Sequence, residues 1–444
     1  MGGVYWRRIG RNLSLSLFGA FAGLFIGLAQ TALLTKSLSV VEYGRLLIVL
    51  NLFPFLSMFV GIRVNDVLYQ LYPQLRERQD TPALRDLLRL CLGLSLVVGL
   101  LIGGGVFLAG NWIARTFYEP ALAPLFRLFA LTVLLSAFTG VYETLLRLHD
   151  RFAVVIVPGI LSSLMVFLGL LAYFLTHAAY AIEQVVLLMS LGIIARCLPP
   201  FALSLWLERD VLFLPGSDRF LSALRPYRAR LKDVLFNANL AGYLKLAFAP
   251  GDIFFLGLFG SPAQVAIYGL ASQLLRPLQL VQDNIQIALM PEVTALWAKG
   301  EAAQLLVWSR RYVRLTFWGG AVVTALAAWL ARPVLLLLAQ PEYMPALPIF
   351  YLMLATTWLT VTFVIFYPLG LSMGLLKWFN LANVVNVLVL IGAILLGPLT
   401  AMRMAWLQFI ATIIRRVGTN WVVWSRLERA AALAPVLKET YEQA

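Results

Sequence analysis

The sequence predicts an all-α protein that crosses a membrane about twelve times, and three observations predict this fold class. The chain has 444 residues, of which 61% are hydrophobic and only 13% are charged. Soluble proteins carry about 25% charged residues, and a soluble chain could not bury so much apolar surface. Apolar runs of about 20 residues, enough to span a bilayer as a helix, recur from Leu13 nearly to the C-terminus. These runs lack the alternation of polar and apolar residues that is typical of transmembrane β-strands.

The predicted spans are joined by short connections, except for one longer loop near the middle of the chain. The spans cover 13–35, 43–71, 86–110, 122–147, 153–176, 181–207, 235–260, 267–292, 312–338, 346–373, 378–397 and 401–425. We expect the first run to be retained as a membrane helix, because its 23 residues exceed the apolar core of a signal peptide. The long loop predicts an N-terminal six-helix lobe (1–208), a basic cytoplasmic linker (209–234) and a C-terminal six-helix lobe (235–444).

Basic residues gather in the loops on one side of the predicted spans. Twenty-one Lys and Arg residues lie in the tails and loops of that side, against four on the other. The positive-inside rule therefore places both termini in the cytoplasm. It also accounts for the net charge of +14 without nucleic-acid binding. The two cysteines, Cys91 and Cys197, fall inside apolar runs and show no zinc-ligand spacing.

The two halves of the chain repeat one another at a nearly constant offset. "EYG" at 42–44 corresponds to "IYG" at 267–269, and "YEPAL" at 118–122 corresponds to "YMPAL" at 343–347, both 225 residues later. Toward the end of each half the offset becomes 220, for "IIARCL" with "IIRRVG" and for the two "LER" motifs at 207–209 and 427–429. Six spans separate the repeats, so the repeats are parallel. They predict two six-helix bundles around a central cavity, with the substrate site between the halves.

Two runs carry a family resemblance. "LTKSLSVVEYGRLLIVLNLFPFLSMFVG" in the first half and "DIFFLGLFGSPAQVAIYGLASQLLRPLQL…ALMPEV" in the second resemble the paired signatures of the oligosaccharide flippase, or polysaccharide transporter, family. This family belongs to the multidrug/oligosaccharidyl-lipid/polysaccharide exporter superfamily. The resemblance implies a bacterial inner-membrane protein that flips undecaprenyl-pyrophosphate-linked sugars to the periplasmic leaflet. It also implies that the first two helices of each lobe line the cavity.

Charged residues inside the predicted spans are candidate site residues, because a charge at bilayer depth is costly and usually faces an interior or a partner. In the span 43–71, Arg45 and Arg63 are 18 residues apart, which is five helical turns. Asp66 and Gln70 follow Arg63 on the same face. This face is predicted to bind substrate through the two arginines, with Asp66 as an ion-pair partner.

The spans 235–260 and 267–292 carry the longest predicted polar stripes. The first has Lys245 and Asp252 seven residues apart. The second has polar residues at spacings of three and four: Ser272, Arg276, Gln279, Asp283 and Gln286. Two readings stay open. Asp252–Arg276 and Lys245–Asp283 form structural ladder pairs, or these groups line the cavity and Lys245, Arg276 and Gln279 bind substrate.

Two arginines occupy equivalent positions near the middle of the last helix of each half, namely Arg196 and Arg416. Each arginine either donates hydrogen bonds to backbone carbonyl groups or contacts an anionic substrate. Surplus arginine suits a pyrophosphate, because guanidinium groups bind phosphate oxygens in a bidentate way. It suits a cationic drug poorly.

Pro54 and Pro277 lie in repeat-related helices and are predicted hinges for alternating access. The resemblance implies coupling of transport to sodium in some relatives. Asp252 with Asn383 and Asn386 would supply such a site, and a proton gradient is the other possible source. Ordinary interhelical hydrogen bonding is the alternative reading of these asparagines. No cofactor is predicted, and the nature of any metal is unknown.

The predicted function is therefore a flippase for a lipid-linked oligosaccharide and not an enzyme, with polysaccharide polymerase machinery as a possible partner. Two other function classes stay open. A multidrug or cation antiporter of the same superfamily would need a carboxylate deep in the first helix of a lobe, and the span 13–35 has none. A membrane polymerase or ligase of lipid-linked glycans would normally need a sizeable external loop, and the predicted external loops are short.

Overall fold

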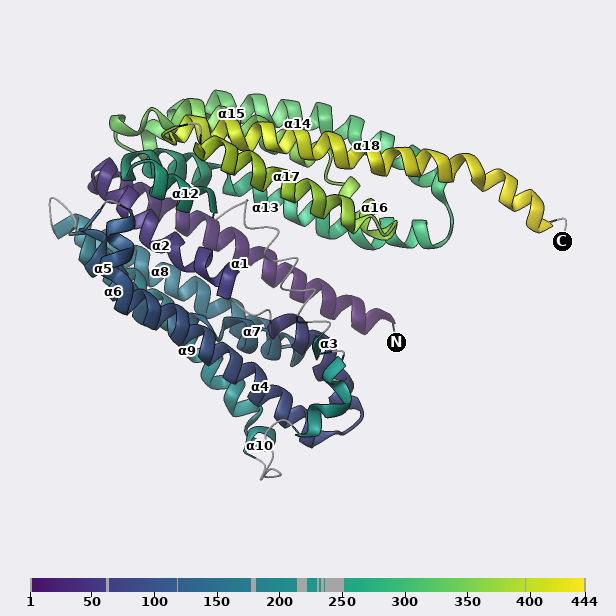
Figure 1. Cartoon of the computed structure of the whole chain (residues 1–444), viewed down its shortest axis with the longest axis horizontal. Coiled ribbons are helices and arrows are strands. Elements are labelled where there is room, and N and C mark those ends of the chain that lie inside the picture. Colours follow the sequence, from purple (N-terminus) through teal and green to yellow (C-terminus); the bar gives the residue numbers. More distant parts are fainter. Residues whose placement is uncertain are drawn as a thin grey trace. The chain divides into compact units, whose positions relative to one another are not determined.

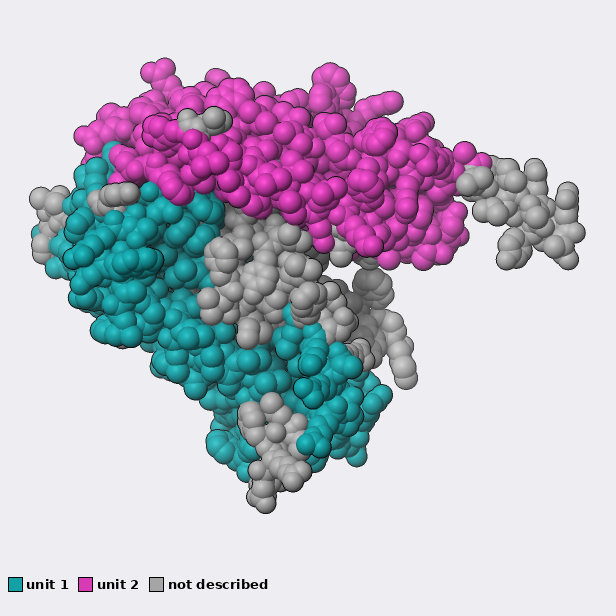
Figure 2. Space-filling view, viewed as in Figure 1, with its two compact units in different colours: residues 1–258 teal, residues 259–444 magenta. Residues whose placement is uncertain are grey.

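A computed structural model describes residues 2–60, 64–117, 119–176, 181–213, 222–229, 231–232, 235, 251–395 and 397–442. All regular elements in these ranges are helices (Figure 1). The prediction of an all-α polytopic membrane protein is confirmed. The chain divides into two compact units, residues 1–258 and 259–444 (Figure 2), and each is described by itself.

The first unit consists of helices from both sides of the predicted linker. Its elements are α1 (Gly2–Ser37), α2 (Val40–Val60), α3 (Val64–Glu77), α4 (Thr81–Gly99), the π-helical turn η1 (Leu100–Gly104), α5 (Gly105–Thr116), α6 (Leu122–Ser136), α7 (Thr139–Leu148), α8 (Phe152–Thr176), α9 (Ile182–Leu207), α10 (Arg209–Leu212), η2 (Ser222–Tyr227) and α12 (Gly251–Phe259). Helix α8 packs against α1 and α9, and α3 packs against α4 and α7.

The second unit consists of the remaining helices. They are α13 (Pro262–Ala298), α14 (Ala302–Leu338), the short turn η3 (Pro341–Tyr343), α15 (Ala346–Thr362), α16 (Phe366–Ser372), α17 (Leu376–Leu395) and α18 (Ala401–Glu442). Helices α14, α15 and α17 each pack along α18, as Figure 1 shows.

Helix starts follow local sequence signals. Asp80 accepts a hydrogen bond from the backbone N–H of Ala83 and so caps α4, and Ser261 caps α13 in the same way through Gln264. A proline follows each cap within the first turn of the helix. The first backbone N–H groups of a helix have no acceptor inside the helix, so the side-chain oxygen of the capping residue accepts from one of them. Proline is favoured in the first turn because it has no backbone N–H that would be left without an acceptor.

The described residues contain six helices that are long and apolar enough to cross a membrane, or eight if each of two bent pairs is one span. These eight coincide with eight predicted spans. Helices α13, α17 and α18 coincide with three more, although α17 is apolar only over 377–392 and the other two contain the polar residues noted above. Most of the predicted span 235–260 lies outside the described residues. The chain is a multi-pass membrane protein.

Two predicted spans are not continuous helices, which corrects the prediction for 122–147 and 346–373. The first is divided into α6 and α7, and its segments Leu122–Ala130 and Thr132–Leu148 are bent by 45° relative to one another. The second is divided into α15 and α16, with a bend of 43°. The interruptions contain Phe138 and Phe363, which are 225 residues apart. Apolar runs reveal length but no bend, because the interrupted residues are themselves apolar. The equivalent positions of these two interruptions support the internal repeat.

The predicted lobe boundary in the linker is not tested directly, although the compact units divide further along the chain. Residues 251–258 group with the first unit. The ring of Phe254 stacks on that of Phe55 at 3.7 Å between ring centres and meets Phe117 edge-on at 5.4 Å. Aromatic packing of this kind joins the start of α12 to α2.

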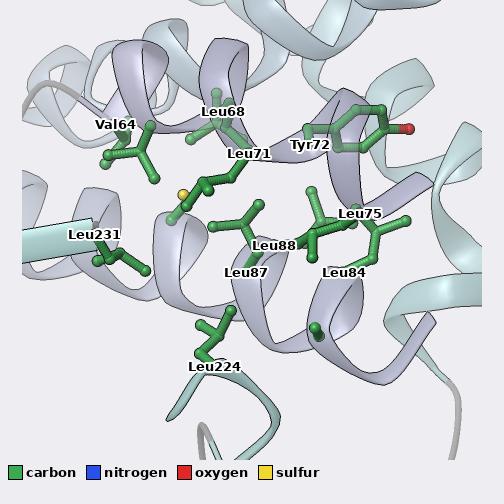
Figure 3. Close-up of a cluster of buried hydrophobic side chains, with 14 of the residues drawn as sticks. Val64, Leu68, Leu71, Tyr72, Leu75, Leu84, Leu87, Leu88, Leu224 and Leu231 are labelled. Atoms are coloured by element: carbon green, nitrogen blue, oxygen red, sulfur yellow. The ribbon is translucent and has the colours of Figure 1, made fainter. Parts of the chain in front are cut away.

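Part of the linker is packed into the core of the first unit. Leu224 and Leu231 are at most 9% exposed and pack with side chains of α3 and α4, including Leu71, Leu75 and Leu87 (Figure 3).

Polar contacts hold the same segment on α4. The backbone N–H of Ala223 donates to Asp86 at 3.2 Å, and Arg85 pairs with the other oxygen of Asp86 at 2.9 Å. Arg89 donates to the carbonyl of Leu212 at 2.7 Å. The described part of the linker is therefore a docked segment and not a free loop.

Candidate functional site

The polar stripe of α13 is the main candidate site. Arg276, Gln279 and Asp283 are all exposed and lie on one face of a 37-residue helix. Leu275 is buried, and the opposite face, with Leu278, packs toward α14 and α15. Ser272 and Gln286 of the predicted stripe are half-buried, and substrate binding by this face stays a prediction.

An apolar cavity lies on the opposite side of α13. It has a volume of about 290 Å³ and is lined by side chains of α13, α14 and α15, including Leu278, Leu315 and Trp358. The absence of a side chain at Gly320 leaves room for the ring of Trp358, whose Nε1 donates to the carbonyl of Phe317 at 2.9 Å. The two faces of α13 thus differ sharply in polarity.

The predicted ladder pairs stay predictions. Lys245 lies outside the described residues. Asp252 is 9% exposed, and its carboxylate accepts from the backbone N–H of Ile253 at 2.8 Å. Asp252 belongs to the first unit, whereas Arg276 and Asp283 belong to the second.

Arg45 has a protein partner that the sequence did not reveal. Its Nη2 lies 2.8 Å from a carboxylate oxygen of Glu119, and its Nε donates to the same oxygen at 3.0 Å. Glu119 is in the turn before α6, 74 residues away along the chain. The pair ties the start of α2 to that turn, so substrate binding by Arg45 would require Glu119 to be shared or displaced.

The face predicted around Arg63 is only partly described, because residues 61–63 lie outside the described ranges. Asp66 is half-buried, and the amide of Asn65 lies 3.5 Å from its carboxylate. Gln70 is exposed. The proposed pairing of Arg63 with Asp66 stays a prediction.

The repeat-related arginines both contact the bent helix of their own unit. Arg196 Nη2 lies 3.7 Å from Glu143 of α7, while its side chain is 55% exposed. Arg416 donates to the carbonyl of Phe363, at the break between α15 and α16, at 3.4 Å. The carbonyl contact of Arg416 favours the structural reading for that residue. The exposure of Arg196 leaves its guanidinium accessible.

The predicted hinges and coupling residues lie within helices. Pro54 is exposed inside α2, and Pro277 is half-buried inside α13. Asn383 is half-buried in α17, and Asn386 lies in the same helix. Hinge motion and ion coupling stay predictions. Among the described residues, no three His, Cys, Asp or Glu side chains are grouped as a metal site would require.

A cluster that sequence reasoning missed joins three elements of the first unit. Glu208, just after α9, accepts from the hydroxyl of Tyr72 in α3 and contacts His149 Nε2, both at 2.5 Å. Arg76 Nη1 donates to the same hydroxyl at 2.6 Å. Glu208 is 136 residues from Tyr72 and 59 from His149, so no local pattern could have grouped them. The only signal was that Glu208 belongs to the repeated "LER" motif.

Comparisons with known proteins agree with this architecture. Residues 9–297 match the family model described as polysaccharide biosynthesis protein. No curated protein sequence matches the chain.

Three solved structures share the fold. The chain is similar to an inward-facing multidrug resistance MATE family transporter of the MOP superfamily, with a TM-score of 0.69 and 14% identity over 92% of this chain and 95% of the other. It is similar to the lipid II flippase MurJ in an inward closed conformation, with a TM-score of 0.66 and 12% identity over 97% and 92%. An outward-facing MATE family transporter gives a TM-score of 0.59 and 14% identity over 95% and 96%.

At these identities the solved structures show a shared fold, and the family model shows kinship over more than half of the chain. The resemblance of the two repeat signatures to polysaccharide transporters is confirmed. The chain belongs to the polysaccharide biosynthesis protein family, with the transporter fold of the MOP superfamily.

Proposed function

We propose that this protein is a flippase, which moves a polyprenyl-pyrophosphate-linked oligosaccharide from the cytoplasmic to the periplasmic leaflet of a bacterial inner membrane. The family supports a role in polysaccharide assembly, and one structural neighbour is a lipid II flippase. Both termini lie in the cytoplasm in this proposal, as the distribution of basic residues predicts.

The exposed polar stripe on α13 is the observation that carries the proposal. A stripe of Arg276, Gln279 and Asp283 on a membrane helix is costly against lipid tails. Water in a transport cavity would hydrate all three side chains. Alternating access of that cavity to the two leaflets would then move a polar headgroup past the hydrocarbon core, while the polyprenyl tail stays in lipid.

The chemistry of the stripe fits a pyrophosphate. Arg276 is exposed, and a guanidinium group presents paired N–H donors that match two phosphate oxygens. Gln279, one turn further along, offers an amide donor and acceptor suited to sugar hydroxyls. Arg196 is a second accessible candidate, because its contact with Glu143 is 3.7 Å long and solvent-exposed.

The antiporter alternative rests on the MATE-like fold. Helix α1 contains no Asp or Glu, so it lacks the carboxylate that we expect to bind a cation or a proton in the first helix of a lobe. The surplus of arginine over acid also disfavours a cationic substrate. Transport without chemical change, for cell-surface polysaccharide or lipopolysaccharide assembly, is therefore the favoured role over an enzyme. Polymerase machinery as a partner stays a prediction.

The proposal is tested in cells that lack the protein and express defined variants. We expect lipid-linked oligosaccharide to accumulate in the cytoplasmic leaflet, where a membrane-impermeant glycosidase added to intact spheroplasts cannot reach it. Arg276→Gln should fail to restore export, and Arg276→Lys should restore it only partly, because lysine offers no bidentate pairing.

A matched control is Arg314→Gln, which removes an exposed arginine from α14, away from the stripe. If Arg276→Gln is present in the membrane at the wild-type level and exports the oligosaccharide normally, Arg276 does not bind the substrate pyrophosphate. Accumulation of single repeat units already in the periplasm would identify a polymerase instead.

A further inference from the structure

The cluster of Tyr72, Arg76, His149 and Glu208 is not part of the proposed transport stripe, and it joins three chain segments. Tyr72 and Arg76 lie in α3, His149 directly follows α7, and Glu208 directly follows α9. All four are at the end of their helices that the orientation places in the cytoplasm. Contacts among them therefore close one end of the first unit.

Hydrogen bonds link the four side chains of the cluster. Arg76 Nη1 donates to the Tyr72 hydroxyl at 2.6 Å, and this hydroxyl donates to Glu208 Oε1 at 2.5 Å. His149 Nε2 lies 2.5 Å from the same Oε1. Because an ionised carboxylate can only accept, we assign the imidazole proton to Nε2. Its second nitrogen, Nδ1, is then the atom that gains or loses a proton.

Burial makes the cluster sensitive to charge. The Glu208 side chain is 3% exposed and that of His149 is 17% exposed, whereas Arg76 is 56% exposed. Burial and the hydrogen bond to Glu208 raise the pKa of Tyr72 well above its ordinary value, so the phenol stays a neutral donor. His149 contacts Tyr72 and Arg76 from α3 and Glu208 from the end of α9.

Arginines nearby have acidic partners of their own. Arg147 of α7 pairs with Glu143 at 2.9 Å, and Arg209 lies 3.5 Å from Asp210. The carboxylate of Glu208 is thus shared mainly between His149 and Tyr72, with Arg76 at 4.0 Å.

We propose that Tyr72, His149 and Glu208 form a proton-binding clasp, in which a proton from the cytoplasm binds His149 Nδ1 and holds the ends of α3, α7 and α9 together. The cytoplasmic location rests on the orientation in the proposed function. Protonation gives the imidazole a positive charge, so its hydrogen bond to the Glu208 carboxylate becomes an ion pair with charge on both partners. Histidine side chains in general can gain this proton within the physiological range of pH.

The clasp is tested by measuring a distance across it in the purified full-length protein in lipid nanodiscs. Glu77 and Phe213 are exposed and take nitroxide labels as Glu77→Cys and Phe213→Cys. The native Cys91 and Cys197 are buried and remain unlabelled. Double electron–electron resonance then reports the fraction of molecules with the short distance. We expect the ratio of short to long distances to rise about fivefold between about pH 8 and pH 6.

Variants separate the clasp from general effects of pH. His149→Gln and Glu208→Gln should abolish the pH dependence. His177→Gln, which removes the second of the two histidines, and Glu428→Gln should retain it. Tyr72→Phe keeps both the imidazole and the carboxylate, so it should retain the pH dependence with a larger open fraction, even if His149→Gln folds poorly.

A distance that does not change with pH in the wild-type protein, or a change that persists in a folded His149→Gln, would overturn the clasp. Because the measurement uses no substrate, it is independent of transport. A pH-dependent clasp in a protein that moves no lipid-linked sugar would overturn the proposed function and leave the clasp standing.

Discussion

The two "LER" motifs place Glu208 and Glu428 at equivalent positions in the repeat, yet the two carboxylates have different surroundings. Glu208 is 3% exposed and contacts Tyr72 and His149. Glu428 is 47% exposed, lies 3.1 Å from Arg310 and accepts from Trp424 Nε1 at 2.8 Å. The guanidinium of Arg310 also stacks over the Trp424 ring at 5.6 Å.

The comparison shows that a repeated motif conserves position and not chemistry. The partner of Glu428 is a permanent cation in a solvated setting, where an ion pair contributes little. The partners of Glu208 are two groups that share protons with it away from water, where removal of one member is costly. The equivalent carboxylates therefore take part in a solvated ion pair at Glu428 and in a buried hydrogen-bonded cluster at Glu208.

Removal of the buried Glu208 carboxylate should produce the largest change in stability. We expect Glu208→Gln to lower the free energy of unfolding by about 2–3 kcal/mol, because charged hydrogen bonds are lost in a buried site. Glu428→Gln should cost less than about 1 kcal/mol. Denaturant unfolding of both variants in the same detergent compares them, and equal losses would refute the contrast.

Removal of the tyrosine hydroxyl should have the next largest effect. Tyr72→Phe loses one donor to Glu208 and one acceptor for Arg76, and we expect a loss of about 1–2 kcal/mol. The control is Tyr312→Phe in the second unit, which loses one bond to the Val361 carbonyl at 3.2 Å. In thermal unfolding, Tyr72→Phe should have a lower melting temperature than Tyr312→Phe. The reverse order would contradict the claim that the cluster around Glu208 contributes more stability.

Coupling energies sharpen the comparison further. A double-mutant cycle with Tyr72→Phe and Glu208→Gln should give about 1 kcal/mol or more, because the two side chains are in direct buried contact. The cycle with Arg310→Gln and Glu428→Gln should give less than about 0.5 kcal/mol and approach zero in 1 M salt, since exposed pairs are screened. If the changes in unfolding free energy caused by Tyr72→Phe and Glu208→Gln are additive, the contact between the two side chains does not contribute to stability.

Alkaline pH should reveal a smaller effect. The raised pKa of Tyr72, caused first by burial and then by Glu208, means that the folded state holds its proton more tightly than the unfolded state. The resulting stability is complete below the ordinary tyrosine value of about 10 and is lost as pH rises above it. Wild-type stability should therefore fall more steeply above about pH 10 than that of Tyr72→Phe, and parallel curves would argue against a buried phenol.

Periodicity was sufficient to predict much of the fold and part of the candidate site. Apolar runs predicted the membrane helices, and spacings of three and four residues placed Arg276, Gln279 and Asp283 on one exposed face. The breaks at Phe138 and Phe363 were predicted as continuous helix, because an apolar residue gives no signal for a break.

Contacts between distant segments could not be predicted in this way. Arg45 contacts Glu119 only because α2 and the turn before α6 lie close together in the fold. Glu208 contacts Tyr72 and His149 because three helices pack together. The linker was predicted as a basic cytoplasmic loop from its lysines and arginines. That prediction did not consider its leucines, which pack against α4. Patterns within one helix identify a face, whereas the partner of that face depends on tertiary packing.

The most direct test of the proposed function is translocation by the purified protein. Proteoliposomes would contain a polyprenyl-pyrophosphate-linked oligosaccharide, with an impermeant glycosidase added outside at timed intervals. The flippase proposal predicts that sugar initially protected inside becomes cleavable at a rate that depends on the protein and falls at least about tenfold in Arg276→Gln, the loss expected for one charged contact. Sugar that stays protected in the presence of folded protein, or that is lengthened into polymer, would contradict it.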